Sequence, residues 1–168
     1  MKKIITVICM AGMLILYGCP AQTEKSIDNG SYNVPTWMSG NWTEIKSNGK
    51  GDSYFLESVK DSKGNILVYS LDSLGKHSSD SRRVILSEIG GAVFLNVYDA
   101  GDDEMSDPGW YLYKFQVVSK TEFTLLPLKE NVVPRSATQE ELRVFLEKNK
   151  DSNDIFDESQ RSRYQKQK

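Results

Sequence analysis

Five carboxylates lie within nine residues, between two apolar runs of the chain: Asp99, Asp102, Asp103, Glu104 and Asp107. Carboxylate oxygens are the ligands that Ca²⁺ prefers, so this cluster is the candidate metal site of the sequence. Its spacing is not that of an EF-hand loop, however, and Gly101 and Pro108-Gly109 are ordinary turn residues. A solvated loop is therefore the favoured interpretation, and a cation site is the alternative.

Acid–base or nucleophilic chemistry has few candidates. His77 is the single histidine and lies in a segment with loop composition. A catalytic triad would need geometry that no local motif indicates. A zinc site of the usual His and Cys type lacks ligands. Glycoside hydrolysis needs two acids on a concave face, for which Glu57 and Glu88 are the faint candidates. We expect no catalytic residue and no cofactor.

Aromatic residues are the candidates for ligand binding. Trp110, Tyr111, Tyr113 and Phe115 cluster in one strand-like run, and Tyr54 and Tyr69 lie in two others. Such side chains could line a cavity for a small apolar or glycan ligand. A packed core is the favoured alternative, because a domain of about seven strands could lack room for a cavity.

The N-terminus has the pattern of a secretory signal. Lys2 and Lys3 precede an uncharged run over residues 4–17. As a helix this run would span only about 21 Å, whereas a bilayer core is about 30 Å thick. Export is thus a better interpretation than a transmembrane anchor.

Leu16-Tyr17-Gly18-Cys19 ends this segment and resembles the lipobox of bacterial lipoproteins. The resemblance implies cleavage after Gly18 and acylation of Cys19, which would bind the protein to a membrane. Pro20 follows where aspartate would signal inner-membrane retention, so we expect the outer membrane in a two-membrane organism. An ordinary signal peptide cut near Ala21 is the alternative.

The remaining chain has the length of a single domain and a mildly acidic composition. Removal of residues 1–18 from the 168-residue chain leaves 150 residues and changes the net charge from −2 to about −4. That length suits one hydrophobic core, and the acidity argues against nucleic-acid binding. Cys9 and Cys19 are the two cysteines, so the mature domain would have no disulfide.

Turn residues and apolar runs predict a mostly β domain. We expect a flexible tether over 19–33, a domain over 34–157 and a disordered polar tail over 158–168. The predicted strands are 37–46, 53–60, 66–71, 83–89, 92–98, 110–118 and 123–128, with a Ser- and Asp-rich loop over 72–81. Gly90-Gly91 favours a primed hairpin turn. The pattern predicts a small antiparallel β-barrel or sandwich of about seven to eight strands.

A C-terminal helix should follow the strands. Thr138-Gln139-Glu140-Glu141 is a capping-box pattern, with Thr138 as N-cap. Leu142, Phe145 and Leu146 then form an apolar stripe that the barrel could bury.

Gly40-Asn41-Trp42 resembles the glycine-any-tryptophan start of lipocalins and other calycins. In that family the tryptophan plugs the closed end of a barrel, so the resemblance gives Gly40 and Trp42 a structural role. The later motifs and the usual cysteine pair of the family are absent, and another small β-fold is the alternative.

The expected function is that of a lipid-anchored envelope protein with a non-catalytic role, either binding or envelope maintenance. Its partner would be the membrane, through Cys19, together with a small apolar molecule, a glycan or an envelope protein. An inhibitor of a secreted hydrolase such as lysozyme is an alternative, although such inhibitors usually depend on a disulfide. A hydrolase is a second alternative.

Overall fold

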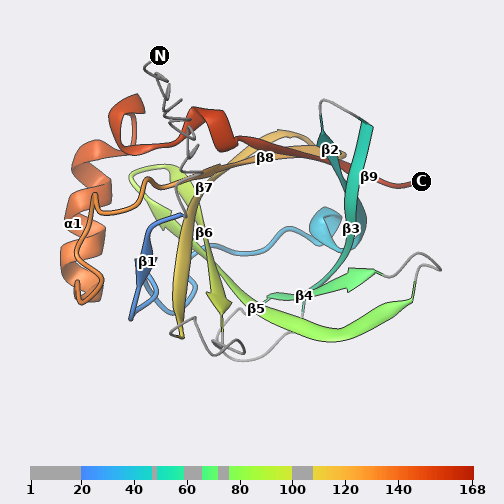
Figure 1. Ribbon diagram of the computed structural model, residues 1–168, viewed down its shortest axis with the longest axis horizontal. Coiled ribbons are helices and arrows are strands. Elements are labelled where there is room, and N and C mark those ends of the chain that lie inside the picture. The colour runs from blue at the N-terminus through green and yellow to red at the C-terminus, as the bar shows by residue number, and fades with distance from the viewer. Residues whose placement is uncertain (1–19, 47–48, 59–65, 72–75, 100–107) are drawn as a thin grey trace, which may run out of the picture.

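The computed structural model describes residues 20–46, 49–58, 66–71, 76–99 and 108–168. Figure 1 shows strands wrapped around a central space, with one α-helix at the side. In chain order the strands are β1 (Gln22–Thr23), β2 (Gly40–Lys46), β3 (Gly49–Ser58), β4 (Ile66–Leu71), β5 (His77–Ile89), β6 (Ala92–Asp99), β7 (Gly109–Ser119), β8 (Glu122–Pro127) and β9 (Ser162–Lys166). The α-helix is α1 (Gln139–Asn149), and short 3₁₀ helices are η1 (Thr36–Met38), η2 (Asn153–Ile155) and η3 (Glu158–Gln160).

Eight of these strands form a closed antiparallel ring. The hydrogen-bonded order is β7-β6-β5-β4-β3-β2-β9-β8, and β8 pairs again with β7. The short β1 pairs antiparallel with the first part of β7, and Gln22 lies opposite Tyr111. This confirms the prediction of a small, mostly β fold with a C-terminal helix.

Strand alternation separates an inner from an outer apolar face. On β6, Leu95 belongs to the cluster inside the ring, whereas Phe94 belongs to a second cluster outside it. Both side chains are almost fully buried. The strand therefore has two covered faces.

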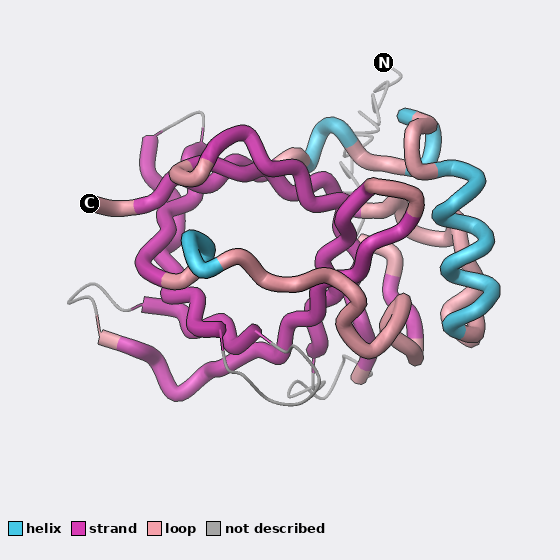
Figure 2. The backbone as a smooth tube through the Cα atoms, turned by 180° about the vertical axis from the view of Figure 1, so that it is seen from behind, coloured by secondary structure: helices cyan, strands magenta, loops and turns pink. Residues whose placement is uncertain are grey.

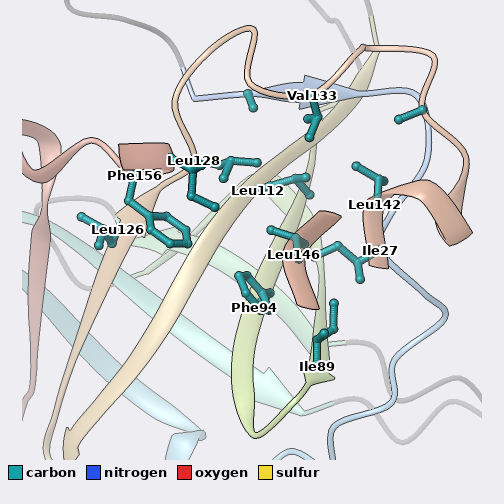
Figure 3. Close-up of a cluster of buried hydrophobic side chains, with 13 residues drawn as sticks. Ile27, Ile89, Phe94, Leu112, Leu126, Leu128, Val133, Leu142, Leu146 and Phe156 are labelled. Atoms are coloured by element: carbon teal, nitrogen blue, oxygen red, sulfur yellow. The ribbon is translucent and has the colours of Figure 1, made fainter. Parts of the chain in front are cut away.

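Helix α1 covers the outer cluster. Thr138 accepts a hydrogen bond from the Glu141 amide at 3.2 Å, and Glu141 accepts one from the Thr138 amide at 2.8 Å, which completes the predicted capping box. Leu142 and Leu146 are fully buried. Figure 3 shows both beside Ile27 and close to Leu112 of the sheet.

One predicted turn agrees with the structure, and one predicted loop agrees only in part. Gly90 and Gly91 both have positive φ, 54° and 80°, as a primed hairpin turn requires. The predicted loop over 72–81 is wrong in its second half, because β5 begins at His77, paired with Leu71. Serine and aspartate are poor strand formers, but the neighbouring β4 supplies the missing backbone partners.

The predicted flexible tether over 19–33 is wrong for the residues that the structure describes. Ala21 and Ile27 are buried, and the Ala21 amide donates to the Leu128 carbonyl at 2.8 Å. The Ile27 amide donates to Asn96 Oδ1, also at 2.8 Å. The segment is small and polar in sequence, yet it is held by backbone hydrogen bonds to distant strands, which local composition does not reveal.

Asp28 is the main polar contact of this docked segment. Its carboxylate accepts hydrogen bonds from Ser87 Oγ at 2.7 Å, from the Gly30 amide at 2.8 Å and from Arg143 Nη1 at 2.9 Å. Burial raises the pKa of Asp28, but hydrogen bonds from Ser31, Ser87 and Gly30 outweigh it, and the net pKa lies below its ordinary value. The ionised form therefore stabilises the docked segment.

Asp28→Asn should loosen residues 21–31 by about 1–3 kcal/mol, because buried donors lose their charged acceptor. Hydrogen exchange at the amides of Ala21, Glu24 and Ile27 measures this. In the wild type the same loosening should appear as the pH falls below about 4, through the lowered pKa of Asp28. Glu130→Gln, at an exposed position, is the control. Equal exchange in both variants would contradict this role of Asp28.

The predicted disordered tail over 158–168 is also wrong. Ser162–Lys166 is strand β9, which lies between β2 and β8 and closes the ring. Its outward residues Arg163 and Gln165 are exposed, and only Tyr164 offers a large apolar surface inward. The strand thus lacks the alternation of apolar residues by which sequence reasoning recognises strands.

Candidate functional site

A cavity of about 600 Å³ lies inside the ring of strands. Its walls are mainly apolar and aromatic, and they include Leu56, Val84, Leu95, Val97, Phe115, Phe123 and Leu125. Polar residues join the lining at Asp52, Tyr54, Arg82, Gln160, Ser162 and Tyr164. The expectation of a fully packed core is therefore wrong, and the volume falls within the range of small-molecule sites, about 300–1,000 Å³.

One end of the ring is closed by the segment that carries η1. Figures 1 and 2 both show η1 lying across the opening of the ring. Trp42 is fully buried beneath it and donates from Nε1 to the Met38 carbonyl at 2.8 Å. Met38 and Trp42 both line the cavity, so they form its floor.

Lys166 of β9 fixes this floor. Its Nζ donates to the carbonyls of Trp37 at 2.6 Å and Ser39 at 2.8 Å, and lies 5.6 Å from the centre of the Trp42 ring. Gly40 has φ +124°, and a Cβ there would lie 3.1 Å from Lys166 Cε. Glycine is therefore favoured at position 40, because a side chain there would strain the backbone at this positive φ and would crowd Lys166. The predicted strand over 37–46 accordingly begins at Gly40, after η1.

Aromatic rings form one continuous wall above the floor. Phe123 lies 4.7 Å from Trp42, 5.1 Å from Phe115 and 4.9 Å from Tyr164, measured between ring centres. Tyr54 continues the series at 6.1 Å from Tyr164. These rings give the deep part of the cavity a rigid apolar surface.

The opposite end carries the charged and hydroxyl groups. Lys46 Nζ lies 3.2 Å from Glu44 Oε2 and 3.7 Å from Asp52 Oδ2, and Ser162 Oγ donates to Glu44 Oε1 at 3.1 Å. We call this end, with Glu44, Lys46, Asp52, Gln160 and Ser162, the mouth. The cavity thus has an apolar floor and a polar mouth.

Two tyrosine hydroxyls lie between floor and mouth. Burial raises the pKa of Tyr164 far above its ordinary value, and the Glu44 carboxylate raises it further. The pKa of Tyr54 is raised by burial and by Asp52. Both phenols therefore stay protonated at any physiological pH, so they can donate hydrogen bonds to a polar group of a ligand.

The structure separates the aromatic residues that the sequence groups together. Tyr113 and Phe115 line the cavity. Trp110 packs against the outer cluster instead, with its ring 5.1 Å from Tyr98, and Tyr111 is not among the lining residues. Successive strand residues point to opposite faces, so Trp110 could not share a cavity with Tyr113. Of the four predicted binding residues, the structure therefore brings Tyr113 and Phe115 to the cavity, but not Trp110 or Tyr111.

Sequence reasoning missed the polar mouth. Gln160, Ser162 and Tyr164 lie in the part of the chain that was predicted to be a disordered tail. Asp52 and Arg82 line the cavity from β3 and β5. The alternation of side chains along the strands was the available signal. Tyr54 pairs with Trp42, and Asp52, two residues before Tyr54, lies on the same face of the sheet.

The other candidate residues have mixed outcomes. Cys19, Asp102, Asp103, Glu104 and Asp107 lie outside the described residues. Asp99, the last residue of β6, is described, and no cluster of metal-ligating side chains exists among the described residues. Glu57 and Glu88 are both exposed, and neither is among the residues that line the cavity. In the described part of the chain, no helix has the length and apolarity to cross a membrane.

No family model matches the chain, and no curated protein does. Among solved structures, a DUF4909 family protein from Staphylococcus aureus subsp. aureus Mu50 is similar, with 11% identity and a TM-score of 0.44. The match covers 79% of this chain and 98% of that one. This likeness is too distant to support an argument about function.

Proposed function

We propose that this protein is a lipid-anchored envelope protein that binds a small apolar or amphipathic ligand inside its β-barrel, without catalysis. The observation that carries the proposal is the cavity of about 600 Å³ with its aromatic wall. The side chains of an eight-stranded barrel can fill its interior completely. Because this interior instead holds a cavity of ligand size, it favours the binding of a ligand.

The distribution of polar groups supports binding rather than chemistry. The described residues of the lining include the acidic Asp52 and the basic Arg82, but no histidine or cysteine. Lys46 interacts with both Glu44 and Asp52, so these carboxylates are engaged with a cation. The protonated phenols Tyr54 and Tyr164 can orient a ligand through hydrogen bonds without exchanging protons with it.

The lipobox-like segment supports the anchored part of the proposal. Acylation of Cys19 would add about 0.8 kcal/mol for each buried methylene, and two chains make a stable anchor. The inhibitor alternative receives no such support, because a ligand-sized cavity is not needed to block an enzyme from outside.

Native mass spectrometry of the full-length protein, purified from its host membrane, tests both parts. We expect a polypeptide that begins at Cys19, with the added mass of its acyl chains, and a further non-covalent apolar ligand that is lost on denaturation. A soluble polypeptide cut elsewhere would contradict the anchor. A protein that carries its acyl chains but never a ligand, even after incubation with a lipid extract, would contradict binding.

A further inference from the structure

Pro20, the first described residue, lies at the mouth of the cavity. It forms a β-bridge with Lys129 and lines the cavity together with Pro127 and Gln160. The next residue, Ala21, is buried and held by its amide bond to Leu128. The chain is therefore fixed to the barrel from Pro20 onward, and no tether separates this point from the domain.

This position restricts where a lipid on Cys19 can be. Cys19 is bonded to Pro20, so a lipid on Cys19 would start one residue along the chain from the lining of the cavity. Its acyl chains would enter the bilayer from there, since each methylene gains by burial. An anchor so close to the barrel holds one end of the barrel at the membrane surface.

The opposite end of the barrel is covered by a described segment of the chain. There η1 lies across the ring, fixed by Lys166 to the carbonyls of Trp37 and Ser39. The mouth and the anchor are thus at the same end, while the floor is at the other. We propose that the mouth of the barrel faces the bilayer and that the cavity takes up a single-chain lipid from it.

The chemistry of the cavity suits such a ligand, and this step rests on the proposed function. An acyl chain would lie along the aromatic wall toward Trp42. Its polar head would remain near the mouth, where the lining residues Arg82 and Tyr54 carry hydrogen-bond donors. A lipid could then move between bilayer and cavity without its chain crossing water, which is the costly part of lipid transfer.

Two single-cysteine variants test the orientation. The mature chain has no cysteine besides Cys19, so an introduced thiol can be labelled selectively. Ser159→Cys places an NBD label on η3 near the mouth, and Lys120→Cys places one on the β7–β8 hairpin, at the far end of β8. The acylated protein is reconstituted in phosphatidylcholine vesicles that contain doxyl-labelled lipid.

The label at 159 should be quenched at least about twofold more than the label at 120, because six strand residues separate the two ends by about 20 Å. Equal quenching, stronger quenching at 120 or no quenching at either site would overturn the proposed orientation.

Lipid uptake is measured with the same preparation. Vesicles loaded with 11-(dansylamino)undecanoic acid should transfer the probe to the anchored wild type at least about tenfold faster than to the soluble Cys19→Ser variant, since proximity raises the local concentration. Equal rates would overturn uptake from the bilayer. If the soluble variant binds the probe while the quenching pattern fails, the proposed function stands and the orientation falls. If neither form binds the probe, the proposed function itself fails.

Discussion

Trp42→Ala should lower the free energy of unfolding by about 3–5 kcal/mol, the usual cost of truncating a large buried aromatic. The indole is fully buried, packs 4.7 Å from Phe123 and donates to the Met38 carbonyl. Its loss would also leave Lys166 Nζ without the ring that it covers. A typical domain has only about 5–15 kcal/mol of stability, so this variant should melt far earlier or fold poorly.

Trp37→Ala is the matched control for this prediction. Trp37 is only half-buried and lies 6.2 Å from Trp42, while the group that Lys166 binds is its backbone carbonyl, which alanine keeps. Denaturant melts should therefore show a much smaller loss for Trp37→Ala. Equal, small losses in the two variants would mean that Trp42 does not hold the barrel floor.

The sequence alone predicts the parts of the fold that depend on local patterns. The capping box at Thr138, the turn at Gly90-Gly91 and the alternating apolar strands are all of this kind, because short-range spacing determines them. Gly40 and Trp42 were singled out by a tripeptide, and the structure shows the physical reason for both residue types.

The parts that were missed depend on partners far away in the sequence. Strand β9 has polar residues outward, and its inward side chains are Ser162, Tyr164 and Lys166, so only its neighbours β2 and β8 make it a strand. The docked N-terminal segment likewise depends on Asn96 and Ser87, which are 69 and 59 residues from their partners Ile27 and Asp28.

The cavity was missed for a different reason. Residue types specify which side chains point inward, but the volume left between them depends on the number of strands in the ring and on its closure. Seven predicted strands left little room, whereas the eighth, β9, completes a wider ring. The error in the tail thus caused the error in the core.

Val97→Trp should abolish most of the ligand binding while leaving the fold intact. Val97 is a half-buried residue of the cavity wall, so an indole at this position can project into empty space rather than into packed side chains. It would occupy volume that a ligand needs, and the affinity should fall at least about tenfold, or about 1.4 kcal/mol. Val118→Trp, at an exposed position of β7, makes the same substitution outside the ring.

Fluorescence titration of these proteins with 11-(dansylamino)undecanoic acid shows whether the barrel holds a ligand site. The soluble Cys19→Ser background is used, so that the membrane anchor plays no part, and thermal melts confirm that each variant is folded. We expect saturable binding of one probe per chain to the parent and to Val118→Trp, and at least about tenfold weaker binding to Val97→Trp. No saturable binding to the parent, or equal affinity in all three proteins, would contradict a ligand site inside the barrel.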